Sequence, residues 1–284
     1  MTSRAVVLGG GGVLGIAWET GVLARLAANG ADLREADLVV GTSAGALVGA
    51  QLACGLDPEH LYARQLAPPV GESRPKSSPL GLFRMVWNLS RSKTSQEFGA
   101  RMGRIALAAR TVPEAERRAQ VARWLGDEVR EWPDRRLVIT AVDAESGEPA
   151  DFDAGSGVDL VDAVCASTAS PGVRPPATIG GRRYIDGGMR SPAGVSLAAG
   201  YDRVVVIAPI TRGGGIMPGV EQQMAELGDG VRTALVTPDP RGWRQVVGSS
   251  MGNLLDPARR APAAELGRSQ RIAEEVTAVW HGVF

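Results

Sequence analysis

The pentapeptide Gly41-Thr42-Ser43-Ala44-Gly45 lies where an apolar strand expected at Asp37 to Val40 gives way to a helical run that begins at Ala44. A serine at such a strand-to-helix turn is held in a strained backbone conformation with its hydroxyl pointing outward, and glycines two residues to either side let the strand and the helix approach closely. This pattern indicates a nucleophile elbow and predicts Ser43 as a covalent nucleophile, with Gly41 and Gly45 as its required glycines. Because the chain holds 37 glycines, the motif alone also arises by chance, and its surroundings must support it.

A second glycine-rich segment precedes the elbow. Ala5-Val6-Val7-Leu8 predicts a short buried strand, and Gly9-Gly10-Gly11-Gly12-Val13-Leu14-Gly15 leads from it into a helical stretch that stops at Asn29-Gly30. Gly10, Gly12 and Gly15 satisfy the dinucleotide-binding fingerprint, so a nucleotide-dependent enzyme stays open as an alternative. That fold places an acidic residue at the end of its second strand, but here the strand ends in Gly41-Thr42-Ser43. We therefore favour an oxyanion hole formed by the N–H groups of Gly10, Gly11 and Gly12.

A serine nucleophile needs a base, and the usual base is histidine. The chain has only two histidines, His60 and His281, and neither stands in a turn-rich setting that would aim its ring at an active site. We expect both to be surface or packing residues. The base is then expected to be a carboxylate.

Two aspartates stand at the ends of predicted strands. Asp186 closes the run Tyr184-Ile185-Asp186 and precedes Gly187 and Gly188, which leave space for a close neighbour, although an Asp-Gly pair is also common in plain turns. Asp143 ends the run Thr140-Ala141-Val142-Asp143 and stays open as a rival. We prefer Asp186 as the base.

Four segments in this order resemble the motifs of the patatin-like phospholipase family. They are residues 9–15, residues 41–45, the stretch Ala166-Ser167-Thr168-Ala169-Ser170-Pro171-Gly172-Val173-Arg174-Pro175-Pro176, and Asp186-Gly187-Gly188, and they span about residues 5–210. The resemblance implies a catalytic dyad without histidine, with Ser43 as nucleophile, Asp186 as base and Gly10 to Gly12 as oxyanion donors. It departs from the family at Leu14, where a basic residue is common, and at Arg174, where the family often has an apolar residue.

The implied reaction is hydrolysis of a lipid ester through an acyl-enzyme, as in a phospholipase, lysophospholipase or esterase, with no cofactor and no metal. Because an ordinary aspartate, with a pKa of about 3.9, is a weak base toward a hydroxyl, strong stabilisation of the tetrahedral state by backbone donors is expected. A catalytically silent lipid-binding member of the same fold is the second alternative.

The order of predicted elements favours an α/β fold with three layers and a mostly parallel central sheet. Strands are expected at about 4–9, 37–41, 136–142, 182–186, 203–209 and 233–237, and residues 1–284 are expected to form one patatin-like domain. In the part after residue 210, we expect a loop over 211–230, a strand, and one amphipathic helix over 262–280 with Leu266, Ile272, Val276 and Trp280 on one side.

Charge limits the possible partners. The 31 basic and 31 acidic residues give no net charge, which argues against nucleic acid as a partner. Residues 71–104 are locally basic and apolar, and three interpretations stay open for them: contact with an anionic membrane surface, a lid over an acyl pocket, or a plain insertion. Cys54 and Cys165 lie in apolar helical contexts and are expected to be buried free thiols. With no leader or long apolar span in view, we expect a cytoplasmic protein, and peripheral contact with a membrane stays open.

Overall fold

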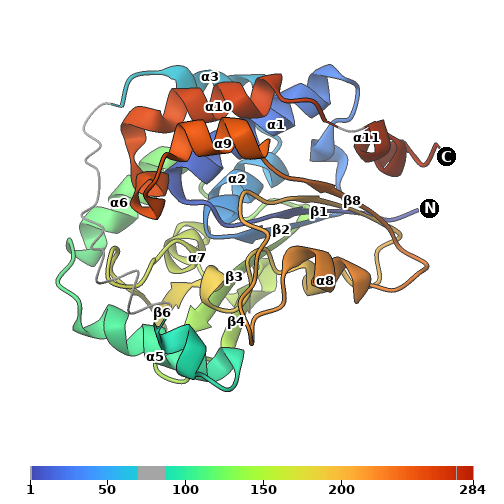
Figure 1. The fold of residues 1–284 in the computed structure, drawn as a ribbon. Helices are drawn as coiled ribbons and strands as arrows, with labels where there is room; N and C mark the ends of the chain where they lie inside the picture. Colours follow the sequence, from blue (N-terminus) through green and yellow to red (C-terminus); the bar gives the residue numbers. More distant parts are fainter. Residues whose placement is uncertain (1, 70–86, 273, 284) are drawn as a thin grey trace.

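The computed structural model describes residues 2–69, 87–272 and 274–283, and one sheet runs through the middle of them (Figure 1). Its strands follow the order β5-β6-β3-β2-β1-β7-β8, with β4 paired to β3 outside that path. The strands are β1 Arg4–Leu8, β2 Leu38–Thr42, β3 Arg136–Asp143, β4 Pro149–Phe152, β5 Ala177–Ile179, β6 Arg182–Asp186, β7 Arg203–Ile207 and β8 Arg232–Val236.

The sheet has a parallel part and an antiparallel part. Strands β1, β2, β3, β7 and β8 pair in parallel, whereas β4 and β6 run antiparallel to β3, and β5 runs antiparallel to β6. The predicted mostly parallel α/β fold is confirmed, and all six predicted strands exist. Strands β4 and β5 were not predicted, because they have only four and three residues, are partly exposed, and lack the apolar runs of buried parallel strands.

Strand β3 brings β2 and β6 together. Its residues 139–140 pair with both β2 and β4, and its residues 141–142 pair with both β4 and β6, so β2 and β6 must share the edge of β3 opposite β4. Thr42, the last residue of β2, pairs with Thr140, and Asp186, the last residue of β6, pairs with the next residue, Ala141. Because β6 runs antiparallel, the carboxyl ends of β2 and β6 meet head to head. This meeting point is where Ser43 follows Thr42.

Helices cover both faces of the sheet. In β1, Val6 and Leu8 contribute to the larger core, and Ala5 and Val7 point into the smaller core on the other face. Helices α1, α2, α7, α10 and α11 line the larger core, whereas α8 and the short helix Val195–Ala198 line the smaller one. The helices are α1 Gly12–Ala28, α2 Ala44–Ala53, α3 Pro58–Leu66, α5 Ser95–Ala108, α6 Glu114–Leu125, α7 Leu160–Ser167, α8 Val220–Ala225, α9 Pro240–Val247, α10 Arg260–Ser269 and α11 Glu274–His281.

Two expectations for the part after residue 210 were wrong. Residues 211–230 contain helix α8, whose Val220 is fully buried in the smaller core. Residues 262–280 do not form one helix: α10 ends at Ser269, and Gln270 adopts an extended backbone. The Gln270 side chain accepts a hydrogen bond from Trp18 Nε1 at 3.0 Å and donates one to the Thr237 carbonyl at 3.1 Å. These bonds hold Gln270, with its extended backbone, against α1 and the residue after β8, and α11 begins separately at Glu274.

The basic, apolar segment 71–104 falls partly outside the described residues, which resume at Trp87. In the described part, the Trp87 side chain is 51% exposed, and the Arg91 guanidinium lies 5.2 Å from the centre of its ring. Within the described ranges, no helix combines the length and apolar character needed to cross a bilayer.

Candidate active site

Ser43 occupies the predicted elbow between β2 and α2. It has φ 54° and ψ −114°, and it is the only non-glycine residue with positive φ among those described. Such a conformation is strained and persists only where the surroundings enforce it. Gly45 supplies one constraint: its N–H donates to the Gly9 carbonyl at 2.9 Å, and a Cβ there would lie 2.2 Å from the Leu8 carbonyl oxygen. Gly41 is similarly tight, because a Cβ on it would lie 2.6 Å from the Gly45 carbonyl oxygen.

Asp186 faces Ser43 from the end of β6. The Ser43 hydroxyl donates to Asp186 Oδ2 at 2.8 Å, although 143 residues separate the two in sequence. The Gly188 N–H donates to Asp186 Oδ1 at 2.9 Å, and Gly187 packs so closely on β3 that a Cβ there would meet Thr140 Oγ1 at 2.2 Å. Ser43 and Asp186 are both buried, with 8% and 4% of their surface exposed. The two residues predicted as nucleophile and base therefore lie together, with the carboxylate held on both oxygens.

The electrostatics of Asp186 suit proton transfer. Burial raises the pKa of its carboxyl above the ordinary value, while hydrogen bonds from Gly188, Ser43 and Ser170 and the charge of Arg117 act in the opposite direction. Burial is the largest of these effects. A buried carboxylate with a raised pKa is a stronger base than an ordinary aspartate.

The glycine loop lies against Ser43 and leads into α1. A Cβ on Gly10 would lie 4.0 Å from Ser43 Oγ, and one on Gly15 would lie 3.2 Å from the Ala44 Cβ, so the loop follows the elbow closely. The Gly10 N–H donates to the Pro192 carbonyl at 2.9 Å. The prediction that Gly10 is an oxyanion donor is therefore corrected, because its amide already has an acceptor inside the fold.

Gly11 and Gly12 stand differently. They form the N-cap and first residue of α1, and across the described residues neither N–H has an acceptor. Gly12 has φ +64°, which favours glycine. Unpaired N–H groups at a helix N-terminus attract negative charge, and the N-terminus of α2 directly follows Ser43.

Leu14, the departure in the glycine loop, is fully buried in the larger core. The side chain therefore packs inward from α1. A lysine or arginine at this position would bring an unpaired charge into an apolar core, which is costly. The leucine is explained by packing on this chain.

The other candidate bases lie elsewhere. His60 is exposed on α3, and the exposed His281 ring faces the Gly30 carbonyl at 3.1 Å. Asp143, at the end of β3, is paired with Arg182 at 2.9 Å and accepts the N–H groups of Glu145 and Ser146 at 3.0 and 2.8 Å. Burial alone would raise its pKa, but these hydrogen bonds and the Arg182 charge together hold that pKa below the ordinary value. Asp143 is thus a weak base that fixes a turn.

The structure adds residues that the sequence analysis quoted without assigning a role. The Ser43 N–H donates to Ser167 Oγ at 2.9 Å, and the Ser170 hydroxyl donates to Asp186 Oδ2 at 3.0 Å. Both serines belong to the stretch 166–176, so its place among the family-like motifs was the available signal. Arg117, which is 4% exposed, donates to Thr168 Oγ1 at 2.9 Å in the same stretch. No sequence pattern singled out Arg117.

The cysteines differ in burial. Cys165 is buried, and burial raises the pKa of its thiol to about 12. Cys54 is only partly buried, and burial raises its pKa as well. Both thiols are free, and the predicted burial is confirmed for Cys165 but wrong for Cys54. Over the residues that the structure describes, no cluster of three or more His, Cys, Asp or Glu side chains has a geometry that could hold a metal ion.

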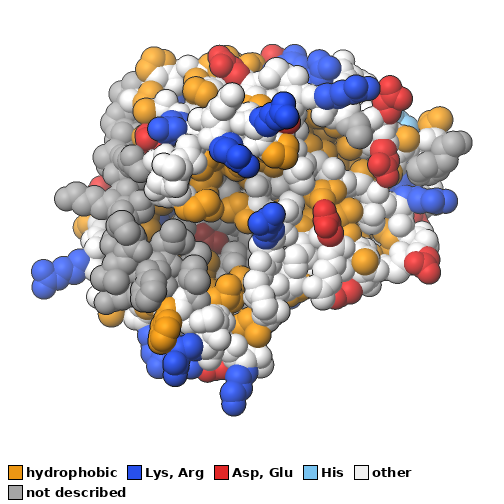
Figure 2. All heavy atoms as spheres, viewed as in Figure 1, with side chains coloured by type: hydrophobic (Ala, Val, Ile, Leu, Met, Phe, Trp, Pro, Cys, Tyr) orange, Lys and Arg blue, Asp and Glu red, His pale blue; other side chains and the backbone are white. Residues whose placement is uncertain are grey.

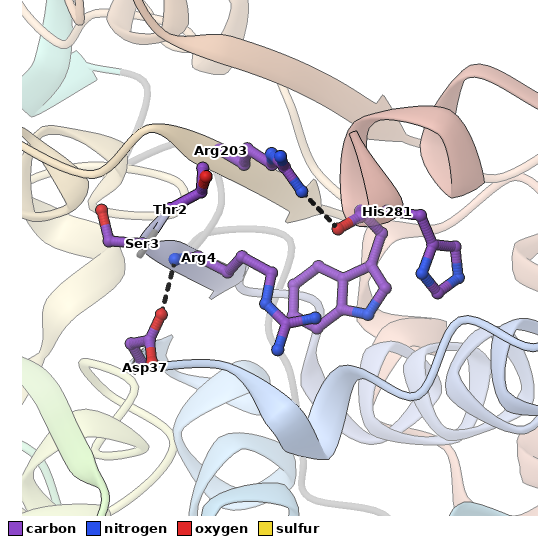
Figure 3. A pocket seen from close by; sticks show the side chains of 7 residues that line it. Thr2, Ser3, Arg4, Asp37, Arg203 and His281 are labelled. Atoms are coloured by element: carbon purple, nitrogen blue, oxygen red, sulfur yellow. Dashed lines mark hydrogen bonds between the residues drawn. The ribbon is translucent and has the colours of Figure 1, made fainter. Parts of the chain in front are cut away.

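A cavity of about 440 Å³ lies at the opposite end of the parallel strands, at the amino ends of β1 and β7 (Figure 3). The Arg4 guanidinium stacks on the Trp280 ring at 4.5 Å and pairs with Glu35, and Arg203 donates to the Trp280 carbonyl at 3.2 Å. These bonds attach α11 to the sheet. The cavity is therefore separate from the Ser43–Asp186 pair, which stands at the carboxyl ends of β2 and β6.

An apolar cluster packs on one face of the antiparallel part of the sheet, around Ile185. Ile185 is buried against α5, and half-buried side chains pack around this cluster, namely Leu89, Ile105, Met189, Ile216 and Met217. Figure 2 shows hydrophobic side chains gathered around a hollow in the middle of this face of the molecule, with an acidic side chain inside it.

Comparisons with known proteins gave one family match and two similar solved structures. No curated protein matches the sequence. Among solved structures, VipD from Legionella pneumophila is similar with a TM-score of 0.44 and 12% identity, over 99% of this chain and 67% of VipD. The type III effector protein ExoU is similar with a TM-score of 0.35 and 20% identity, over 95% of this chain and 54% of ExoU. The model of the family described as patatin-like phospholipase matches residues 6–199, which is more than half of the chain. The chain therefore belongs to the patatin-like phospholipase family.

Proposed function

We propose that this chain is a serine-dependent lipid acyl hydrolase of the phospholipase, lysophospholipase or esterase type, with Ser43 as nucleophile and Asp186 as base. Membership of a family of lipid-hydrolysing enzymes supports the reaction class. The observation that carries the residue assignment is the 2.8 Å hydrogen bond from the Ser43 hydroxyl to a buried Asp186 oxygen.

The proposed reaction has two stages. Ser43 Oγ attacks the ester carbonyl carbon while its proton passes to Asp186 Oδ2, which gives a tetrahedral oxyanion. The C–O bond to the alcohol breaks, and the alcohol leaves with the proton from Asp186. Water then attacks the acyl-enzyme, gives a proton to Asp186, and the carboxylic acid leaves as that proton returns to Ser43 Oγ. In each stage Asp186 takes up one proton and releases it again.

The oxyanion is proposed to bind the N–H groups of Gly11 and Gly12. These groups stand at the N-terminus of a 17-residue helix, whose dipole favours negative charge. Gly10 is left out because its N–H donates to Pro192. Removing one such donor typically lowers the rate by about 10²- to 10³-fold.

Labelling tests the nucleophile. A fluorophosphonate probe is expected to label the folded wild type and to fail with Ser43→Ala and with unfolded wild type. Turnover of a short-chain nitrophenyl ester is expected to disappear with Ser43→Ala as well. Labelling at equal rate in Ser43→Ala, or none in the wild type, would contradict the proposal.

A second glycine with positive φ, Gly30, serves as a matched control for the oxyanion donors. Gly12→Ala would put a Cβ 2.8 Å from the Leu254 carbonyl oxygen and displace the loop, whereas Gly30, beyond the far end of α1, has φ +88° and no neighbour within 4 Å of a built Cβ. Both substitutions strain a positive φ, but only Gly12→Ala is expected to lower kcat, by about 10²-fold or more. Equal loss in both variants would mean that backbone strain alone explains the effect.

The substrate is proposed to be a lipid ester, because the family is one of phospholipases and half-buried apolar side chains gather around Ile185, the residue before Asp186. Peripheral contact with an anionic membrane through 71–104 is part of the same proposal, supported in the described residues by the exposed Trp87 and the neighbouring Arg91. Sedimentation with anionic vesicles should recover less Trp87→Ser than wild type, whereas Val283→Ser, at another exposed apolar residue, should bind unchanged.

A further inference from the structure

Four consecutive residues, Ser167 to Ser170, link the proposed nucleophile to the proposed base. Ser167 Oγ accepts the N–H of Ser43 at 2.9 Å. The Ala169 carbonyl accepts the N–H of Asp186 at 3.2 Å. Ser170 Oγ donates to Asp186 Oδ2 at 3.0 Å, the same oxygen that accepts the Ser43 hydroxyl. We call this segment the 167–170 turn.

The 167–170 turn is itself fixed at the end of α7. The N–H and the hydroxyl of Thr168 both donate to the Val164 carbonyl, at 3.0 and 2.8 Å, which closes the last helical turn. From α6, the buried Arg117 guanidinium donates to Thr168 Oγ1 at 2.9 Å and lies 4.9 Å from the centre of the Trp124 ring. Burial lowers the pKa of Arg117 to about 9. A side chain that is costly to bury is thus used to hold the turn.

Two features of Asp186 indicate what the turn does. A carboxylate oxygen has two lone pairs, and at Oδ2 the hydroxyls of Ser43 and Ser170 supply two donors for them. At Oδ1 the Gly188 N–H donates from the other side. With donors from three separate residues, rotation of the carboxylate would break at least one bond. The oxygen that must receive the proton is therefore held toward Ser43.

We propose that Ser170 is a positioning residue for Asp186, holding Oδ2 in line with Ser43 Oγ, and that Ser167 holds the strained backbone of Ser43. This inference rests on the proposed function and adds two residues to the machinery of that site. Neither serine is proposed to touch the reacting carbonyl.

The Ser170 hydroxyl also favours the charged form of the carboxylate. A hydroxyl donor stabilises an ionised carboxylate more than a protonated one, because protonation of Oδ2 removes charge and a lone pair. Without that donor, the pKa of Asp186 is expected to rise further, since burial then meets less opposition. A substitution at Ser170 should therefore change the pH dependence of the rate and not only its size.

The chain offers a matched control for Ser170. Ser146 is also partly buried, and its hydroxyl donates to Asp143 Oδ1 at 3.0 Å, the same bond type on the other strand-end aspartate. Ser170→Ala is expected to lower kcat/KM by about 10- to 100-fold and to move the acid limb of its pH profile to higher pH. Ser146→Ala is expected to leave both unchanged.

A second pair separates loss of the hydroxyl from loss of packing. Ser170→Thr keeps a hydroxyl and should retain most of the wild-type activity. Ser170→Val has nearly the shape of the threonine variant but no hydroxyl donor, and it should behave like Ser170→Ala. This pair also serves if Ser170→Ala fails to fold. Equal activity and equal pH profiles in the threonine and valine variants, or in Ser170→Ala and wild type, would overturn the assignment of Ser170.

Labelling tests Ser167 and keeps the two proposals apart. Ser167→Ala is expected to have the melting temperature of wild type but to react with the fluorophosphonate probe about tenfold more slowly, because the Ser43 N–H has lost its acceptor. An equal labelling rate would remove Ser167 from the proposal. If wild type is not labelled at all, the proposed function fails. If wild type is labelled and turns over but the Ser167 and Ser170 variants match it, only the present inference fails.

Discussion

Asp186 and Asp143 stand at the ends of neighbouring strands, both are 4% exposed, and both accept a serine hydroxyl, yet they differ in their electrostatics. Asp143 is paired with Arg182 and with the N–H groups of its own turn, which keeps its pKa low. Asp186 has no carboxylate-to-arginine contact within hydrogen-bonding distance among the described residues, and burial raises its pKa. The difference teaches that position at a strand end does not make a base, because the environment decides how strongly a carboxylate holds a proton.

The second difference is what each aspartate faces. Asp143 bends back over its own turn and ties residues 145 and 146 to it. Asp186 ends β6 beside the end of β2, and its carboxylate accepts the hydroxyl of Ser43. The comparison therefore predicts a catalytic role for one carboxylate and a structural role for the other; three experiments address it, and a fourth extends it to another buried carboxyl.

The largest expected effect is on turnover. Asp186→Asn should lower kcat about 10⁴-fold, because an amide of the same shape cannot take the Ser43 proton. Asp143→Asn, the matched substitution at the rival, should keep kcat within about tenfold of wild type. Ester hydrolysis by the two purified variants checks this, with melting temperatures to confirm folding. A larger loss in Asp143→Asn than in Asp186→Asn would reverse the comparison.

The pH profile comes next. The pKa of Asp186 is raised by burial, and the ionised form is the one that accepts a proton, so kcat/KM should fall with decreasing pH already above the ordinary aspartate range. The acid limb should stay in place in Asp143→Asn, since that carboxyl titrates lower and takes no proton in the reaction. If the acid limb of the profile moved in Asp143→Asn, the titrating group would be Asp143, which would contradict the proposal.

The third effect is on stability and belongs to Asp143. Its folded pKa is lowered, so its contribution is present above the unfolded pKa of about 3.9 and is lost as pH falls through the folded value. Asp143→Asn should reduce the free energy of unfolding by about 1–3 kcal/mol at neutral pH, and by less in acid, because its uncharged oxygen accepts the turn hydrogen bonds more weakly and the ion pair with Arg182 is lost. Arg182→Met should cost about 1 kcal/mol or less, because Arg182 is 58% exposed. Urea unfolding at pH 7 and pH 3 measures both.

The smallest effect concerns Glu19, a third buried carboxyl, which lies on α1 and has no part in the proposed reaction. It is fully buried, and burial raises its pKa well above the ordinary value, while the Gly9 N–H acts in the opposite direction. A raised folded pKa gives stability that is present below the unfolded pKa and lost as pH rises through the folded pKa. Glu19→Gln should therefore flatten the fall of melting temperature between weakly acidic and neutral pH. An unchanged slope would show that Glu19 does not titrate in this range.

Much of the fold follows from local sequence patterns. The five parallel strands were all predicted: β1, β2, β3 and β7 are mostly apolar because they are buried almost throughout, and the partly exposed β8 still carries Ala234, Leu235 and Val236. Strands β4 and β5 carry no such signal, because one side of each is exposed and their place depends on pairing with β3 and β6. The break between α10 and α11 depends on Gln270 reaching Trp18 and Thr237, which are distant in sequence. A single domain over 1–284 and a cytoplasmic location stay predictions.

The candidate site divides in the same way. The elbow at Ser43 and the loop before α1 were readable because glycine spacing reports local backbone geometry. The choice of Gly11 and Gly12 over Gly10 was not readable, because the acceptor for the Gly10 amide is the carbonyl of Pro192, far along the chain. Ser167 and Ser170 stood in a quoted motif but received a role only when their partners were known.

The sequence by itself determined the strained serine turn, the apolar strands around it and the carboxylate that follows the last of the family-like motifs. These are local properties, set by glycine conformation and by the burial that apolar runs require. Only the tertiary structure decided that Ser43 meets Asp186 and not Asp143. The reason is the pairing of β3. Along the edge of β3 opposite β4, β2 pairs in parallel and ends at Thr42, and β6 pairs antiparallel beyond it and ends at Asp186. The two carboxyl ends therefore meet, and the buried Asp186 becomes the neighbour of Ser43.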